Sequence, residues 1–478
     1  MRQSRLRIGP DQILLGAVFL TLSISTALWT RADKSPPSWD PSDHLIAAYD
    51  YYRPIAHGQI SGFAHEFFSS MHYYAPLVHL TSGFFFLIFG ASRLSGIAVN
   101  LLSLAITLGS VWWMGNHIYA RNGKRESSDA HDAVPADTEQ GDNAGLHISA
   151  GAIAAVFAVC YHFPAWLLHD AFLDYPLMAI VTLSFALLIN AGDFRVRRDA
   201  VIFGISAGLG LLVKQTFPFF FVLPAIYLVA RAILTRDGKA LANLVLAGTI
   251  AGLIAAIWYA PHIKDVIAIY RINQKGAIDE NEAPLFSFMS NVVYLHGLVS
   301  YQIQAVFGLV FIAGMIFSIA RYRRQSVLLY LWVASGIIGF TLVANKDIRY
   351  TVPVLPAVAL ISVAWIGSDG VRLGLPGLFK RAHRSAESVP SESAAVRRRP
   401  WRLSSRTVEF LKLAATAGLL VWAGVSFFNA QWPAPGMGRY IDTPRFRWMV
   451  NARNYFGFDH APFSNDWSVP EVISTITN

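Results

Sequence analysis

The run "ILLGAVFLTLSISTALW", residues 13–29, contains no charged side chain, and the stretch "SWDPSDHL", residues 38–45, follows it closely. The first run consists of apolar or small residues and approaches the roughly 20 residues that cross a bilayer core as a helix. The second places Asp40, Asp43 and His44 just beyond the end of that helix. The pattern predicts a membrane helix that leads into a carboxylate-bearing loop.

The whole chain has the composition of a membrane protein. Of its 478 residues, 54% are hydrophobic and 14% are charged, whereas soluble proteins carry about 25% charged residues. The net charge is +9, but the basic residues sit between apolar runs, as in cytoplasmic loops, so they indicate no nucleic-acid partner. The single cysteine, Cys160, excludes an intrachain disulfide. We predict an all-α polytopic membrane protein.

Apolar runs separated by basic clusters mark the expected membrane spans. The positive-inside rule places the clusters between alternate pairs of runs, together with the N-terminal arginines, in the cytoplasm. The pattern predicts about 11 transmembrane helices, with the N-terminus inside and the C-terminus outside. The runs cover residues 11–29, 92–118, 148–167, 175–191, 200–213, 217–234, 241–258, 293–320, 326–344, 351–368 and 407–428.

One further apolar run, residues 75–90, breaks this alternation. It is short and contains a histidine, and runs of about 10–14 residues are often interfacial. We therefore predict that it lies along the outer membrane face as an interfacial helix of the first external loop, residues 30–91. A short true span is the alternative.

Two hydrophilic segments, residues 120–147 and 370–406, are expected to be cytoplasmic loops. Residues 120–147 and, within the second segment, 380–405 are rich in Ser, Ala, Asp, Glu and Arg and nearly without aromatics. Such stretches bury too little apolar area to order themselves. We expect a transmembrane domain over residues 1–428. The external tail, residues 429–478, is either short or the beginning of a soluble domain.

The strongly polar turns other than the basic loops fall on the face that this topology places outside. Ionisable groups at membrane depth are costly and usually functional. Acids and bases that converge at one interface indicate a site for a charged, membrane-anchored substrate. These turns hold Asp40, Asp43 and His44, the segment His169 to Asp174, Lys214, Tyr259 to Asp265 and Asn345 to Tyr350.

The order of short motifs resembles the GT-C membrane glycosyltransferases, in the branch of the protein O-mannosyltransferases and the lipid A aminoarabinose transferases. The resemblance covers about residues 11–368 and rests on "YYAPL", "FFFLIFG", "RLSGIAVNLL", "LDYPL", "GLGLLVK" and "NKDIRYTVPVLPA" in that order. It implies that a polyprenyl-phosphate donor gives up its sugar with inversion at the extracytoplasmic face of the cell inner membrane. The implied acceptor is an envelope lipid, a glycan or a protein.

The resemblance assigns the catalytic acid of the first external loop to Asp40. Many relatives have Asp-Glu there, whereas this chain has Asp40-Pro41 with Asp43 after them, so both carboxylates stay candidates. Tyr74 begins a match to Tyr-Pro-Pro-Leu in which Ala75 replaces the first proline. The Glu-Lys that precedes this motif in some relatives is missing, which argues against an aminoarabinose donor.

An inverting transfer needs a base near the acceptor nucleophile. Asp40 is the predicted base, and Asp43 is predicted to orient the acceptor or a cation. The alternative is that Ser42 or Asp43 merely caps the next helix, since both residue types are good N-caps.

The departing phosphate needs fixed positive charge. The predicted phosphate ligands are Lys214, Arg349 and Lys346, because Arg offers a planar fork and Lys a point charge. Snorkelling is the alternative for Lys214, and a local ion pair with Asp347 is the alternative for Arg349. The remaining candidates for substrate contacts are His44, Tyr74, Asp174, Tyr259 and Tyr350, with a hydrogen bond inside its own turn as the alternative for Asp174.

No cofactor or metal-ligand set is predicted. A divalent cation at His169, Asp170 and Asp174, or at Asp43 and His44, stays open as an alternative. Neither phosphate-cradling GxxxxGK[ST] nor GxGxxG occurs after a strand, so the donor is expected to be lipid-linked rather than a nucleotide sugar.

Two other functions stay open. A transporter or flippase of lipid-linked sugars would place its charges at the bilayer midplane between repeated halves, whereas here they gather at one face. A non-catalytic subunit of envelope glycan assembly would tolerate the loss of Asp40.

Overall fold

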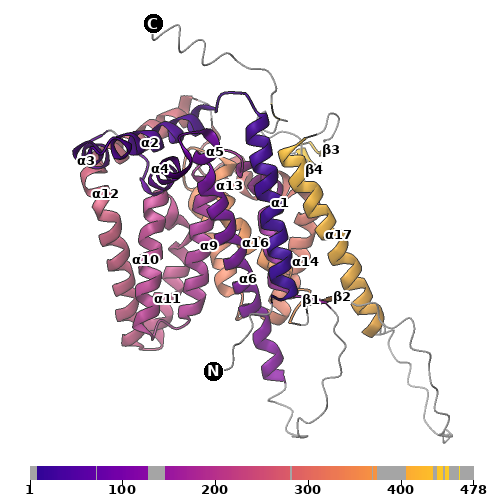
Figure 1. Ribbon diagram of the computed structural model, residues 1–478. Helices are drawn as coiled ribbons and strands as arrows, with labels where there is room; N and C mark the ends of the chain where they lie inside the picture. The colour runs from indigo at the N-terminus through magenta and orange to yellow at the C-terminus, as the bar shows by residue number, and fades with distance from the viewer. Residues whose placement is uncertain are drawn as a thin grey trace, which may run out of the picture.

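The computed structural model describes residues 8–70, 73–126, 146–279, 282–368, 370–373, 405–433, 439–444, 447–451 and 462. These residues form an all-α membrane protein, a bundle of helices that run in roughly one direction with further helices across one end (Figure 1). The two β-ribbons are short and antiparallel, β1 (Leu146–Ile148) with β2 (Val371–Leu373) and β3 (Arg439–Asp442) with β4 (Arg447–Asn451).

The helices follow the apolar runs of the sequence. Each predicted run falls on one or two of them, because backbone groups in lipid must bond within their own segment. Short 3₁₀ or π segments interrupt the bundle at η1 (Phe217–Phe220), η2 (Leu298–Gln302) and η3 (Ile348–Val354). The α-helices are α1 (Pro10–Ala32), α2 (Trp39–Ala56), α3 (Ile60–Phe68), α4 (Leu77–Phe89), α5 (Arg93–Gly96), α6 (Ala98–Glu126), α7 (Ala150–Cys160), α8 (His162–Leu167), α9 (Asp174–Ala191), α10 (Arg197–Val213), α11 (Val222–Leu234), α12 (Gly238–Asp279), α13 (Phe288–Gly297), α14 (Gln304–Tyr322), α15 (Val327–Thr341), α16 (Leu355–Ser362) and α17 (Ser405–Gln431).

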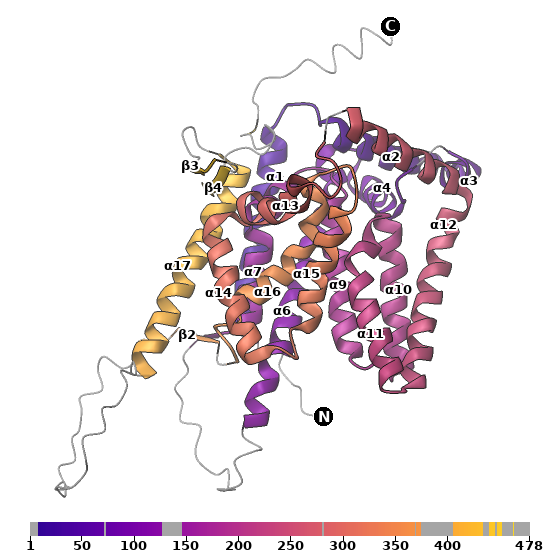
Figure 2. The ribbon, with the colours of Figure 1, turned by 180° about the vertical axis from the view of Figure 1, so that it is seen from behind.

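Within the described residues, six helical segments are long and apolar enough to cross a membrane. They comprise α1, the stretch from α5 through most of α6, α9, α12, α14 and α17. Shorter apolar helices, among them α7, α11 and α15, lie beside them in the bundle (Figure 2). The protein is therefore multi-pass, and the figure of eleven spans stays a prediction.

The first loop forms a platform of helices at one end of the bundle. In Figure 1, α2 and α3 run across this end, and α4 is seen end-on while the bundle helices stand upright. This orientation agrees with the interfacial prediction for residues 75–90. The first helix of the platform begins earlier than expected, because α2 starts at Trp39 with Ser38 as its N-cap residue. Ser42 and Asp43 therefore lie inside the helix and do not cap it.

The helix α12 is much longer than the apolar run that predicted it. The run ended at residue 258, before the polar segment "YAPHIKD", but α12 is 42 residues long, continues to Asp279 and contains Pro261. A proline inside a helix removes a hydrogen bond and kinks the axis. Beyond it, the second half of α12 lies across the same end of the bundle as α2 (Figure 2).

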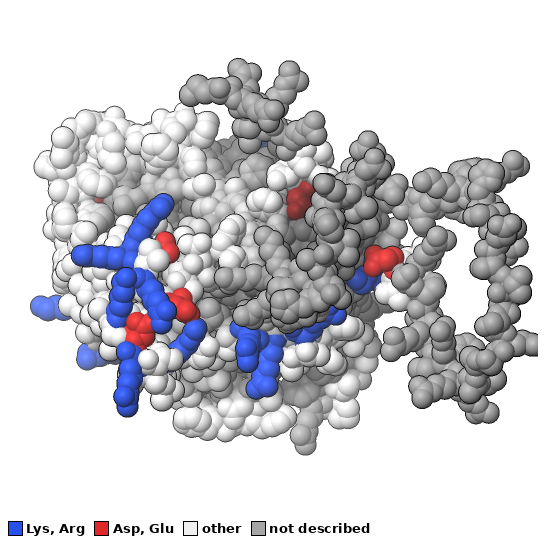
Figure 3. Space-filling model, turned by 90° about the horizontal axis from the view of Figure 1, so that it is seen from below, with Lys and Arg blue, Asp and Glu red and all other residues white. Residues whose placement is uncertain are grey.

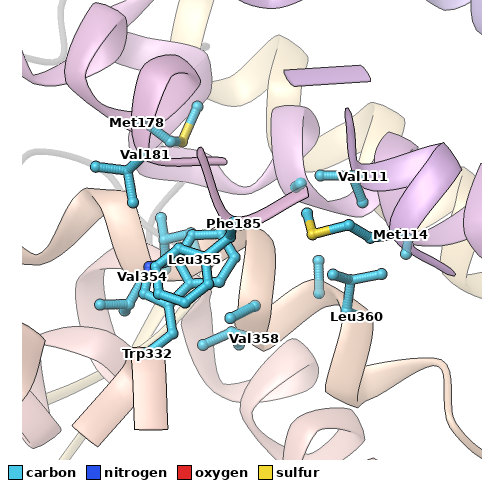
Figure 4. Packing of buried hydrophobic residues seen from close by; sticks show 14 of the residues in the cluster. Val111, Met114, Met178, Val181, Phe185, Trp332, Val354, Leu355, Val358 and Leu360 are labelled. Carbon is cyan, nitrogen blue, oxygen red and sulfur yellow. The ribbon is translucent and has the colours of Figure 1, made fainter. Parts of the chain in front are cut away.

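The core lies where α6, α7, α9 and α16 meet. Every residue of α7 and of α16 is buried. Phe185 of α9 stacks on Trp332 of α15 with ring centroids 4.0 Å apart, and Val111 and Met114 of α6 lie nearby (Figure 4). In a membrane, close packing rather than the exclusion of water holds such helices together.

Small residues let α6 and α7 approach closely. A Cβ added to Gly151 of α7 would lie 2.4 Å from the backbone oxygen of Trp112. We expect Gly151→Ala to lower the free energy of unfolding by about 1–3 kcal/mol through overpacking. The matched control is Gly109→Ala on α6, where an added Cβ has nothing within 4 Å. Equal thermal unfolding midpoints for the two variants in detergent would contradict the close crossing.

The opposite end of the bundle is basic. Figure 3, seen from below, shows Lys and Arg side chains gathered on this face. Asp11 of α1 lies near the same end and accepts hydrogen bonds from the backbone N–H of Ser149 (2.9 Å), its hydroxyl (2.6 Å) and the indole N–H of Trp112 (2.8 Å). The exposed basic residues here include Arg195, Arg197, Arg198, Arg231, Arg236, Lys239, Arg321, Arg323 and Arg324.

Parts of three predicted regions lie outside the described residues. They are residues 127–145 and 374–404 of the two hydrophilic loops and most of the tail 429–478. The domain division at residue 428 therefore stays a prediction.

Candidate functional site

A cavity of about 260 Å³ lies at the end of the bundle that the platform and the second half of α12 cover. Its walls come from α2, the segment before α4, the connection between α10 and η1, α12, and the end of α15 with η3. The lining residues are Asp40, Tyr74, Lys214, Gln215, Thr216, Phe219, Val266, Ile269, Tyr270, Asn273, Gln274, Phe340, Val343, Asn345, Arg349 and Tyr350.

Asp40 lies in the first turn of α2, where the helix dipole favours a negative charge. Its Oδ2 accepts a hydrogen bond of 3.1 Å from Nη1 of Arg349, more than three hundred residues away in the sequence. The side chain stays 27% exposed. Asp40 is therefore an accessible carboxylate held at the cavity wall.

Arg349 is fixed by a second carboxylate as well. Its Nε and Nη2 lie 2.7 Å and 2.6 Å from Oδ2 of Asp347. The other oxygen of Asp347 accepts from the backbone N–H of Arg349 and so starts η3. The guanidinium plane lies 4.4 Å from the ring centre of Phe172. The ion pair with Asp347 that was the alternative for Arg349 is therefore present. Arg349 nevertheless lines the cavity, because the same pair holds its guanidinium against Asp40.

Lys214 follows directly after α10, in extended backbone that leads to η1. Its Nζ lies 2.7 Å from Oδ1 of Asp174, and the side chains are only 10% and 3% exposed. The ammonium also lies 5.3 Å from the ring centre of Tyr350. Because the lysine is buried, it does not snorkel. Asp174 is not among the lining residues, and its Oδ1 is paired with Lys214 rather than with a group of its own turn.

Two predicted tyrosines line the cavity. Burial raises the pKa of Tyr74 above its usual value, and the nearby charge of Asp40 acts in the same direction. Its hydroxyl therefore stays protonated at neutral pH and can donate a hydrogen bond. Tyr350 donates from its hydroxyl to Oδ1 of Asn345 at 3.2 Å.

His44 lies behind the cavity wall. It is buried, its Nδ1 is 3.2 Å from Nε2 of His79, and its ring meets the edge of Tyr74. Burial lowers the pKa of His44 well below its usual value, and His79, Lys214 and Arg349 lower it further. His44 is therefore neutral at pH 7 and supports Tyr74 rather than lining the cavity.

Three other predicted residues lie outside the cavity lining. Asp43 is exposed on α2. The ammonium of Lys346 donates to the carbonyls of Phe340, Thr341 and Val343 and so caps the end of α15. Tyr259 donates to the carbonyl of Leu211 at 2.9 Å, which ties α12 to α10. The structure gives Lys346 and Tyr259 structural roles in place of phosphate and substrate contacts.

The amides and the threonine hydroxyl that line the cavity were not predicted from the sequence. Gln215 and Thr216 follow Lys214 directly, so their position next to a predicted ligand was a usable signal. Asn273 and Gln274 carried none, because the apolar run ended fifteen residues before them, at 258.

The proposed cation clusters are not assembled. His169 stacks on Trp29 at 3.7 Å, and Oδ1 of Asp170 accepts from the next backbone N–H. In the part of the chain that the structure describes, no group of three or more His, Cys, Asp and Glu side chains could hold a metal ion.

No family model and no curated protein matches the chain. Among solved structures, it is similar to ArnT from Cupriavidus metallidurans bound to undecaprenyl phosphate, with a TM-score of 0.44 and 18% identity over 73% of this chain and 59% of that chain. The apo state of ArnT gives 0.42 and 17% over 73% and 58%. The chain thus spans less than two thirds of the length of these ArnT chains.

Proposed function

We propose that the protein is a membrane glycosyltransferase that moves a sugar from a polyprenyl-phosphate donor to an envelope lipid, glycan or protein acceptor with inversion. The observation that carries the proposal is one cavity that holds a carboxylate, Asp40, beside two fixed cations, Lys214 and Arg349. Charge of both signs at one end of an apolar bundle suits a donor with an apolar tail and an anionic leaving group.

Asp40 acts as the general base. As the acceptor oxygen attacks the anomeric carbon, the carboxylate takes its proton, and the bond from that carbon to the phosphate oxygen breaks. A base of this kind contributes about 10²–10⁴-fold. Arg349 orients the carboxylate through the 3.1 Å contact.

Lys214 and Arg349 stabilise the phosphate as it departs. Both lie at the cavity wall, and both are held by carboxylates before any ligand arrives. Preorganised charge of this kind costs no rearrangement when negative charge develops on the leaving oxygen. Lys346 is left out of this role, because it caps α15.

A reconstituted transfer assay tests the proposal. Purified protein in vesicles that contain radiolabelled polyprenyl-phosphate sugar and envelope lipid is expected to move the label to an acceptor and to release polyprenyl phosphate. Movement of the intact donor across the bilayer without cleavage would favour the flippase alternative. Neither cleavage nor movement in the presence of lipid, glycan and protein acceptors would favour a non-catalytic subunit.

We further propose that the cavity end faces the outside of the inner membrane and the basic end the cytoplasm, since positive charge is retained inside. Lys34 and Lys239 are exposed at the cavity end and the basic end. Because the native Cys160 is buried, labelling with a thiol reagent will reflect only the single cysteine introduced at either position. In intact cells an impermeant thiol reagent should label Lys34→Cys and spare Lys239→Cys, and the reverse pattern would invert the topology.

A further inference from the structure

The cavity offers neutral polar groups where the donor sugar would lie. Beside the charged residues, its lining contains amides and hydroxyls from three elements, together with the ring of Tyr270. Amides can donate and accept at once, which suits sugar hydroxyls. The neutral hydrogen-bonding residues are Gln215, Thr216, Asn273, Gln274 and Asn345.

The carboxylates around the cavity are already paired. Asp40 and Asp347 contact Arg349, and Asp174 contacts Lys214. Among the described residues that line the cavity, Asp40 is the sole carboxylate. A protonated amino group on the sugar would find the one lining carboxylate already engaged by Arg349, whereas a sugar hydroxyl needs no counter-charge.

Two acceptors at the wall lack a partner. Oε1 of Gln215 and Oγ1 of Thr216 are buried and have no hydrogen-bond partner among the described residues. Unsatisfied buried polar atoms are rare in proteins, so each calls for an explanation. Because both atoms are covered, a sugar hydroxyl in the cavity can donate to them once these side chains rotate toward it.

We propose that the donated sugar is uncharged and is recognised through its hydroxyl groups by Gln215, Thr216 and the amides of α12, Asn273 and Gln274. The inference rests on the proposed function and names the substrate class of its site. A site of this kind would select an uncharged sugar over an amino sugar.

Two matched donors test the inference. One is a polyprenyl-phosphate neutral sugar, and the other carries the same sugar with one hydroxyl replaced by an amino group. In reconstituted vesicles, wild-type protein is expected to favour the neutral donor at least about 10-fold in kcat/KM. Equal use, or preference for the amino sugar, would overturn the inference and leave the proposed function intact. Cleavage of neither donor would instead contradict the proposed function.

Variants identify the residues involved. Gln215→Leu and Gln274→Leu are each expected to lower kcat/KM for the neutral donor by about 3–10-fold, the usual scale of one hydrogen bond, mainly through KM. The control is Gln59→Leu, an exposed glutamine of the platform outside the cavity lining. Thermal unfolding identifies a variant that fails to fold, in which case the other one decides. Unchanged kcat/KM in a folded variant would remove that glutamine from sugar recognition, and unchanged values in both would overturn the assignment.

Discussion

Asp40→Asn is expected to lower sugar transfer by at least about 10²-fold while the donor lipid still binds. Asparagine keeps the shape of the side chain but cannot take the proton of the acceptor, and loss of a general base costs on this scale. The fold should survive, because Arg349 keeps its second partner, Asp347. Single-turnover transfer and equilibrium binding of the donor, measured on the same vesicles, separate the two effects.

Asp43→Asn is the matched control for this experiment. It removes a carboxylate from the same helix, but from a side chain that is exposed and outside the cavity lining. We expect transfer within about 3-fold of wild type, as for a surface change. Loss of transfer in Asp43→Asn together with normal transfer in Asp40→Asn would make Asp43 the base.

Lys214→Met is expected to damage both stability and catalysis. It removes the ion-pair partner of the buried Asp174 carboxylate, and losing one partner of a buried pair costs about 3–5 kcal/mol. It also removes a charge-assisted contact to the donor phosphate worth about 1.5–3 kcal/mol. In kcat/KM the second loss amounts to roughly one to two decades.

The double variant Lys214→Met with Asp174→Asn separates the two losses. Neutralising both partners removes the uncompensated charge, so the thermal unfolding midpoint should recover most of the way to wild type. Transfer should stay low, because the phosphate still lacks its cation. Recovery of activity together with stability would show that Lys214 serves only as the partner of Asp174.

The sequence predicted those parts of the fold and site that depend on local pattern. Apolar runs became helices because a lipid-embedded chain has few other ways to satisfy its backbone. Motif order brought Asp40, Lys214 and Arg349 into consideration together, and the structure places all three at one cavity. The roles of these residues in catalysis stay predictions until the variants are measured.

The parts that could not be predicted depend on tertiary contacts. The second half of α12 carries the charged residues Lys264, Asp265 and Arg271, so the apolar pattern of a membrane span ends before it. The helix was therefore not predicted there, because it lies across the end of the bundle rather than through it (Figure 2). Lys346 was predicted to bind phosphate because its ammonium is a point charge close to Arg349 in the sequence. The carbonyls that accept hydrogen bonds from this ammonium are available because α15 ends at Thr341.

The hydrogen bonds of Asp11 have a consequence for biosynthesis. The partners of this carboxylate, Trp112 and Ser149, lie 101 and 138 residues later in the chain. At translation rates of about 5–20 residues per second, the first helix waits on the order of ten seconds before Ser149 leaves the ribosome. During that time the carboxylate of Asp11 lacks these two hydrogen-bond partners. We therefore expect newly made α1 to stay in contact with the insertion machinery until α6 and α7 are made and supply the hydrogen bonds to Asp11.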